Sequence, residues 1–317
     1  MLDAGKGAKL WHGPPPWPHQ VAAFDRCVEL LHGGPGRGLC QAPTGTGKSR
    51  VIRALAYWAI AIRRRVIICL PTEEILQQFA SDFRRESRQP FYVEKAEKEA
   101  PSYAQVVLAS HQTLWRRLLR YDPRTALLFD EAHHGNELAL RNLSTLERFH
   151  HVLGFSASPW SLECEAIYHD QVLHLYPLRQ AIEQGYLCSY ELRPFPELAP
   201  APGKHELWYC SSNEEARELA RSCPASAYLG YDRADQRAGL VARFRAGQLR
   251  RLYLNRMLVE GFDCREVATI FIDKESDSDL LNYQMVGRGL RRKASGAGLI
   301  VYARDLAGVQ RALARAG

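Results

Sequence analysis

The segment Gln41–Arg50 has the residue types and spacing of a phosphate-binding loop. Glycines at positions 45 and 47 lack a Cβ, so the backbone can turn sharply and direct N–H groups toward phosphate oxygens. Lys48 supplies a charge for the β- and γ-phosphates, and the Ser49 hydroxyl suits a Mg²⁺ ligand. Ala42 replaces the first glycine of the G-x-x-x-x-G-K-S pattern. The residues expected to contact a nucleoside triphosphate are Thr44, Gly45, Thr46, Gly47, Lys48, Ser49 and Arg50.

A second candidate for chemistry is the apolar run Leu127–Phe129, which ends in two carboxylates. Asp130 is expected to hold Mg²⁺, directly or through water. Glu131 is expected to orient and deprotonate the water that attacks the γ-phosphate. The pair is therefore predicted to be catalytic.

A third candidate is the basic segment Gln284–Arg292. Arg288 and Arg291 are three residues apart, so a helix through this segment would place both guanidinium groups on one face. Paired guanidinium groups suit the charge that develops on a transferring phosphoryl group. Taken alone, a basic helix of this kind is more often a solvated face.

The elements that must position these residues are short apolar strands alternating with helical stretches, a pattern that predicts α/β domains with parallel sheets. In the first half, the expected strands are 38–41, 66–70, 105–109, 126–129 and 151–155, and the expected helices are 49–62, 73–84 and 111–120. In the second half, the expected strands are 206–210, 225–229, 251–254, 268–273 and 298–302, and the expected helices are 214–221 and 234–245. Functional loops should gather at the carboxyl ends of the strands.

Two domains are expected, 1–175 and 176–317, with a loop-rich region at 161–204 between the two patterns. A chain of 317 residues has the length for two ordinary domains, each with its own core. The second half has no phosphate loop of its own, so it is suited to close over a nucleotide held by the first.

Composition excludes several classes of protein. The longest apolar run, Ala54–Ile62, is too short to span a bilayer, and Met1–Leu10 lacks the apolar core of a signal peptide. We therefore expect an intracellular protein, cytoplasmic or nucleoid-associated, with no membrane partner. The eight cysteines form no C-x-x-C pair and no zinc-like spacing, so a structural metal is not expected.

The net charge is +7, from 42 basic and 35 acidic residues. Basic clusters occur at 63–65, 116–120, 250–251 and 288–293. This balance favours a polyanionic partner, although a solvated basic surface without a partner would give the same count.

The three motifs, in this order, resemble superfamily 2 helicases and translocases of the DExH branch, and the resemblance covers nearly the whole chain. It implies two tandem RecA-like domains with ATP and Mg²⁺ in the cleft between them. Gln20 stands at the adenine-reading position, where the family's usual Arg three residues earlier is Trp17 here. Pro71 and Thr72 lie in a segment that resembles motif Ia, which contacts the nucleic-acid backbone. Ser110 stands where the next backbone contact is expected.

Further motifs extend the resemblance. Ser156 and Ser158 lie in a segment similar to motif III, which couples hydrolysis to domain movement. His133, which completes the carboxylate motif, is expected to share this coupling role. In the second half, Ser211 belongs to a segment that resembles motif IV, and Asn255 stands where many members have a backbone-contacting Thr. Gly261 and Asp263 match motif V, near the ribose. Gln284, Arg288 and Arg291 match motif VI, in which the two arginines act as fingers on the γ-phosphate.

The resemblance favours DNA over RNA as the partner. His133, the motif VI wording and the segment Tyr176–Leu187 are more similar to UvsW-like and XPB-like helicases and to restriction-enzyme motor subunits. DEAD-box RNA helicases carry Asp at the place of His133. The expected activity is a nucleic-acid-stimulated ATPase that moves along forked, branched or duplex DNA, as a monomer or within a larger complex. The alternatives are an RNA-dependent ATPase and a non-catalytic ATP-gated clamp or motor subunit.

Overall fold

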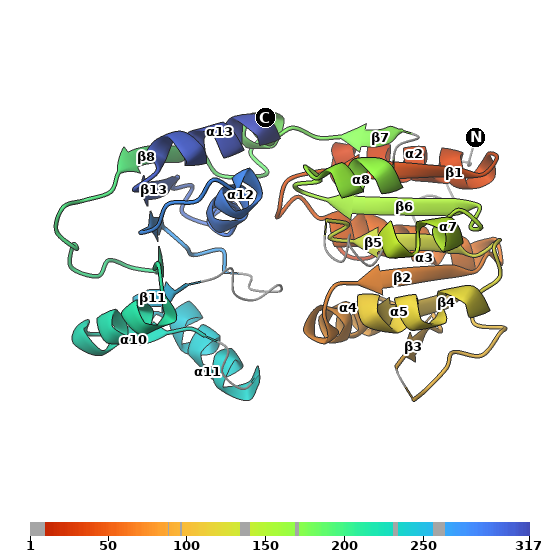
Figure 1. The fold of residues 1–317 in the computed structure, drawn as a ribbon, viewed down its shortest axis with the longest axis horizontal. Coiled ribbons are helices and arrows are strands. Elements are labelled where there is room, and N and C mark those ends of the chain that lie inside the picture. The colour runs from red at the N-terminus through yellow and green to blue at the C-terminus, as the bar shows by residue number, and fades with distance from the viewer. Residues whose placement is uncertain are drawn as a thin grey trace. The chain divides into compact units, whose positions relative to one another are not determined.

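The computed structural model describes residues 10–87, 89–95, 97–133, 140–168, 171–230, 234–255 and 264–317. Contacts between Cα atoms divide the chain into two compact units, which Figure 1 shows. The first comprises Met1–Ala42 with Gly47–Tyr176, and the second comprises Pro177–Gly317 with Pro43–Thr46.

The first unit is built on a seven-stranded sheet with the strand order β3-β4-β2-β5-β6-β1-β7. Paired strands run parallel throughout it. The strands are β1 (Gly36–Gln41), β2 (Val66–Leu70), β3 (Tyr92–Glu94), β4 (Val106–Ser110), β5 (Ala126–Asp130), β6 (His151–Ser156) and β7 (Val172–Leu175). The helices are α2 (Pro18–His32), α3 (Lys48–Ala61), α4 (Glu73–Glu86), α5 (His111–Arg117), η2 (Leu118–Arg120), α7 (Leu143–Leu146) and α8 (Leu162–Ile167).

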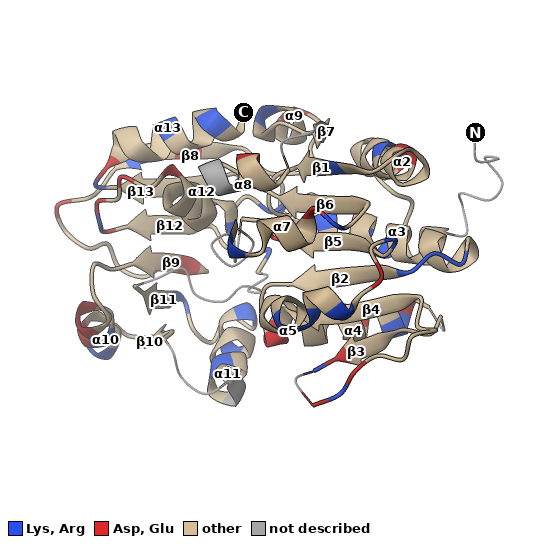
Figure 2. Cartoon of the chain, turned by 45° about the vertical axis from the view of Figure 1, so that its right-hand side comes forward, with Lys and Arg blue, Asp and Glu red and all other residues tan. Residues whose placement is uncertain are grey.

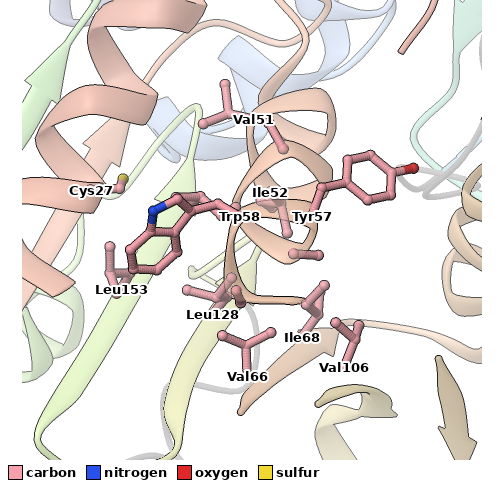
Figure 3. Packing of buried hydrophobic residues seen from close by; sticks show 14 of the residues in the cluster. Cys27, Val51, Ile52, Tyr57, Trp58, Val66, Ile68, Val106, Leu128 and Leu153 are labelled. Carbon is pink, nitrogen blue, oxygen red and sulfur yellow. The ribbon is translucent and has the colours of Figure 1, made fainter. Parts of the chain in front are cut away.

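The core of this unit fixes α3 against the sheet. Ile52, Leu55 and Trp58 recur at helical spacing and are almost completely buried. They belong to one apolar cluster with Val66, Ile68, Leu128 and Leu153 of the strands, and Figure 3 shows Trp58 and Ile52 beside strand residues. Because the buried stripe runs along most of the helix, the first turn of α3 is held at the carboxyl end of β1.

The second unit is built on a six-stranded parallel sheet with the order β10-β11-β9-β12-β13-β8. Its strands are β8 (Tyr190–Pro194), β9 (Glu206–Tyr209), β10 (Ser226–Tyr228), β11 (Arg251–Leu254), β12 (Thr269–Ile272) and β13 (Leu299–Ala303). Its helices are α9 (Leu178–Glu183), α10 (Asn213–Ser222), α11 (Ala234–Arg245), α12 (Asp279–Gly287) and α13 (Leu306–Ala316). Stacked rings of Trp208, Phe271 and Tyr302 lie on one face of this sheet.

The predicted α/β fold with two parallel sheets is confirmed. The predicted loop-rich region at 161–204 contains four short elements, α8, β7, α9 and β8, and has no helix or strand over 195–204. Both of these strands are at sheet edges, where one side has no neighbouring strand and the apolar signal is weak. Among the described residues, no helix has the length and apolarity that a membrane span requires.

Candidate functional site

The strand order brings three predicted motifs to one edge of the first sheet. β6 lies between β1 and β5, with Gln41 paired to Ser156 and Asp130 paired to Phe155. Because the strands are parallel, their carboxyl ends meet at the same edge. The phosphate-loop candidate, the carboxylate pair and the 156–158 segment therefore start from neighbouring strands.

The loop after β1 has the backbone that its glycines predict. Gly45 and Gly47 have φ values of 92° and 88°, in the left-handed region that favours glycine. A Cβ on Gly47 would lie 2.3 Å from Nε2 of Gln20. The Thr46 hydroxyl donates to the Pro43 carbonyl at 2.7 Å, and Lys48 Nζ donates to the Ala42 carbonyl at 3.1 Å. These contacts hold the loop as a compact turn at the N-terminus of α3, where backbone N–H groups suit an anion.

Ser49 and Asp130, which lie far apart in the sequence, meet at this edge. The Ser49 hydroxyl donates to Oδ2 of Asp130 at 3.2 Å. Burial raises the pKa of Asp130 to about 6, the neighbouring Glu131 charge adds to the rise, and Lys48 and Ser49 oppose it. A hydroxyl beside a buried carboxylate is the oxygen-donor set that Mg²⁺ prefers, and a divalent cation would favour the ionised carboxylate. The two residues therefore fit the predicted metal role.

Glu131 has a backbone conformation that is unusual for its residue type. Its φ is 47°, and its backbone N–H donates to Oδ1 of Asp130 at 3.1 Å. Oε2 of Glu131 lies 3.6 Å from Nδ1 of His133. Left-handed backbone at a non-glycine residue is concentrated at functional sites, because it directs a side chain where a strand would not. Here the Glu131 carboxylate is partly exposed beside His133, whereas Asp130 is buried.

Ser156 contacts both the carboxylate motif and the phosphate loop. Its hydroxyl lies 2.9 Å from Nδ1 of His133 and accepts the backbone N–H of Ser158 at 3.1 Å. Its carbonyl accepts the N–H of Ala42, the first loop residue, at 3.1 Å. The three residues predicted to couple hydrolysis to movement, His133, Ser156 and Ser158, therefore lie together and contact the start of the phosphate loop.

Gln20 lies in the first turn of α2. The Trp17 backbone N–H donates to its Oε1 at 3.0 Å, and Nη1 of Arg50 lies 3.5 Å from the same oxygen. The Arg50 guanidinium also donates to the carbonyls of His12, Pro14 and Pro15. Arg50 thus ties α3 to the segment before α2, a role that the sequence pattern did not indicate.

Two of the predicted nucleic-acid contacts in the first unit are helix caps. Thr72 follows Pro71 and accepts the N–H of Ile75, and Ser110 accepts the N–H of Thr113. β2 and β4 are neighbours, with Leu70 paired to Ser110, so both caps lie at the same edge of the sheet. Thr72 and Ser110 therefore cap the helices that follow them, and the Ser110 hydroxyl also donates to Oγ1 of Thr113 at 3.0 Å.

The second unit brings Ser211 and Asn255 together. The Asn255 amide donates to the Ser211 carbonyl at 2.8 Å, and the Ser211 hydroxyl donates to the Asp273 carbonyl at 2.9 Å. Lys274, which the sequence analysis did not single out, donates to the Asn255 carbonyl at 2.7 Å. Its position just after the apolar strand β12 is the feature of the sequence that could have marked Lys274 as a candidate. Gly261 and Asp263 lie outside the described residues.

The prediction of one helical face for both arginines is wrong. α12 carries Gln284 but ends at Gly287, Arg288 is its C-cap, and Arg291 forms a β-bridge with Leu187. The chain leaves the helix where Gly289 approaches the sheet, since a Cβ there would lie 2.5 Å from Leu299. Arg288 remains close to the carboxyl end of β9, because its charge opposes the burial that raises the pKa of Tyr209 to about 12.

Comparison with known sequences finds one matching family model and a helicase-like relative. Residues 14–161 match the family model described as Type III restriction enzyme, res subunit. A Saccharomyces cerevisiae protein described as the ATP-dependent helicase IRC3 is 22% identical over 344 aligned residues, which cover 86% of this chain and 49% of that protein. The chain thus spans about half the length of this curated relative.

Solved structures share the fold. A fragment described as an HsdR subunit of a type I restriction enzyme from Vibrio vulnificus has a TM-score of 0.74 at 17% identity, and the match covers 94% of this chain and 66% of that chain. The Type ISP restriction-modification enzyme LlaBIII bound to DNA gives 0.69 at 14% identity, over 91% of this chain and 27% of that chain. Saccharomyces cerevisiae Dbp5 bound to RNA and ADP BeF3 gives 0.62 at 13% identity, over 97% and 92%. The chain therefore shares the fold of these solved structures, with two RecA-like sheets, and its residues 14–161 are similar to the res subunit of restriction enzymes.

Proposed function

We propose that the chain is an ATP-dependent DNA translocase or helicase motor. The observation that carries this proposal is the grouping of Lys48, Ser49, Asp130 and Glu131 at the carboxyl ends of β1 and β5, with Ser49 bonded to Asp130. A phosphate loop alone would support many nucleotide-binding functions. A phosphate loop with a metal-type carboxylate and an adjacent Glu in the left-handed conformation supports hydrolysis.

In the proposed reaction, the backbone N–H groups around Gly45 and Gly47 and the Lys48 ammonium hold the phosphates of ATP. Ser49 and Asp130 would hold Mg²⁺, which neutralises phosphate charge when it is bound. Glu131 orients a water toward the γ-phosphate and accepts its proton. Arg288 and Arg291 stabilise the charge that develops on the transferring phosphoryl group when the two units close around it.

Closure of the two units would depend on the γ-phosphate, because Arg288 and Arg291 would no longer have a phosphate to contact once it leaves. Ser156 supports a coupling role for its segment, since it contacts both the carboxylate motif and the loop. The backbone-contact candidates Pro71, Thr72, Ser110, Ser211 and Asn255 lie at the carboxyl edges of their sheets. If both units bind the backbone of one nucleic-acid strand through such contacts, each cycle of closure moves the contacts of one unit along the strand relative to those of the other. Contacts of this kind carry no base sequence information.

The choice of DNA rests on the res-subunit match and on LlaBIII, whose structure contains DNA. The rival candidate is an RNA-dependent ATPase, which the similarity to RNA-bound Dbp5 supports. ATPase rates should be measured with single-stranded DNA, duplex DNA, forked DNA and RNA of matched length. We expect stimulation by at least one DNA substrate. Stimulation by RNA alone would refute the DNA assignment, and an absence of ATP turnover with every substrate would favour an ATP-gated clamp.

A further inference from the structure

The segment that bears both arginines is fixed by its own backbone after α12 ends. The Cys188 N–H donates to the Leu290 carbonyl at 2.9 Å, and Leu187 bridges to Arg291. Gly289 and Leu290 are buried between the two arginines, which are both partly exposed. The positions of Arg288 and Arg291 therefore depend on how firmly the short stretch between them is held.

Lys293 also contacts the stretch between the two arginines. Its side chain is 7% exposed, and Nζ lies 3.2 Å from the Gly289 carbonyl and 3.1 Å from Sγ of Cys188. Within the described residues, no carboxylate contacts this ammonium. A buried cation without a carboxylate is unfavourable unless its hydrogen bonds are well made, and a charged donor makes stronger hydrogen bonds than a neutral one. Lys293 thus joins the residue between the arginines to the strand-like segment that carries Cys188.

We propose that Lys293 is a positioning residue for the arginine pair, acting through the Gly289 carbonyl. The inference rests on the proposed function, because it assigns Lys293 a role in ATP turnover. Loss of the ammonium would free the 288–291 segment, whereas Lys48 and Ser49 are held by α3 of the first unit. A displacement of about 1 Å at a charge-stabilising group can lower turnover by roughly 10²-fold.

The test compares Lys293→Met with the control Lys204→Met, which removes an exposed lysine from the same unit. We expect Lys293→Met to lower kcat for nucleic-acid-stimulated ATP hydrolysis by at least tenfold. The Kd for ADP should stay within twofold, because ADP lacks the γ-phosphate that the arginines contact. Lys293→Arg, which keeps a cation and N–H donors, should recover most of the lost kcat, and Lys204→Met should behave as the unmodified protein.

Combination with Arg291→Ala separates positioning from general stability. If Lys293 acts through the arginines, adding Lys293→Met to Arg291→Ala should lower kcat by less than a further twofold. A full additional loss, or a parallel loss of ADP affinity, would overturn the inference in favour of a general structural role. If Lys293→Met does not fold, Lys293→Gln keeps a donor with a shorter reach, and the same kcat loss is expected from it.

Failure of this inference is distinguishable from failure of the proposed function. If Arg291→Ala loses turnover while a folded Lys293 variant hydrolyses ATP at the normal rate, the positioning role is refuted and the motor function stands. If the unmodified protein does not hydrolyse ATP, or if Arg288→Ala and Arg291→Ala both turn over normally, both proposals are refuted.

Discussion

At the scale of single residues, Glu131 and Asp130 show how adjacent carboxylates acquire different properties. Asp130 is buried at the end of β5, and its pKa is raised to about 6. Glu131 leaves the strand with φ 47°, and its carboxylate is partly exposed beside His133. One carboxylate is therefore held in the interior, where a cation would bind it, and the other is held where water can reach it.

We expect Glu131→Gln to keep ATP binding and to lose ATP hydrolysis by roughly 10² or more, since the amide cannot accept the proton of the attacking water. The change removes one charge without altering side-chain size. Nucleotide affinity and single-turnover hydrolysis should be measured together. Glu147→Gln, at an exposed position of the same unit, is the control. Unchanged turnover in Glu131→Gln would remove this residue from the catalytic mechanism.

His151 provides a prediction about stability and pH. Burial, with the Arg64 guanidinium 2.6 Å away, lowers the pKa of His151 to about 4, against an ordinary value near 6.5. Between about pH 4 and pH 6.5 the unfolded chain therefore binds a proton that the native protein does not bind. The stabilisation is complete above pH 6.5 and is lost as the pH falls toward 4, by an amount on the order of 3 kcal/mol.

Chemical unfolding of His151→Phe between pH 4 and 7 should show a flatter dependence on pH than the unmodified protein shows. His150→Phe alters the exposed neighbouring histidine and should leave the dependence in place. An unchanged slope in His151→Phe would show that another group titrates in this range.

At the scale of elements, the inner strands could be predicted from sequence and the edge strands could not. β2 and β5 are buried along their whole length, so each is a continuous apolar run. The edge strands β7 and β8 have mixed burial, and β8 contains Pro194, which edge strands tolerate. The phosphate loop was predictable because its residues are local. The end of α12 was not, because it depends on the contact of Gly289 with Leu299.

The basic clusters were also incompletely predicted. Arg251 is 1% exposed, pairs with Glu206 and lies over the Trp208 ring. Arg117 is buried against Glu94, and Arg64 bonds to His151 and to the Leu31 carbonyl. The partners of these arginines lie 23 to 87 residues away in the chain, so a local sequence pattern could not predict the contacts. Part of the basic excess therefore stabilises the interior of the fold.

The buried pair at the start of β9 and β11 leads to a prediction for the second unit. Nε of Arg251 donates to Glu206 at 2.7 Å inside the sheet. Glu206→Gln leaves a buried guanidinium without its counter-charge and should destabilise the protein by about 3 kcal/mol. Glu191→Gln breaks an exposed pair with Arg193 and should leave the free energy of unfolding nearly unchanged. Denaturant unfolding of both variants tests this, and equal effects would contradict it.

At the scale of the whole molecule, the net charge of +7 does not show where the basic side chains lie. Figure 2 shows Lys and Arg on exposed elements such as α11, which carries Arg237, Arg243 and Arg245. The candidate backbone contacts from the family motifs, by contrast, are neutral side chains: Thr72, Ser110, Ser211 and Asn255. Neutral donors hold a phosphate without releasing counterions, so they add affinity without adding salt dependence. A steep salt dependence must then come from cations near these contacts.

Lys274 is the cation that the structure places beside Asn255 and, through it, Ser211. If single-stranded DNA passes this edge of the second sheet, Lys274→Met should weaken binding and reduce the slope of log K against log salt by about 0.7, the value for one phosphate contact on a single strand. Ser211→Ala should weaken binding at every salt concentration and leave the slope unchanged. Titrations at four or more salt concentrations separate the two effects. A Lys274→Met variant with normal affinity and an unchanged slope would show that the strand follows another path across the unit.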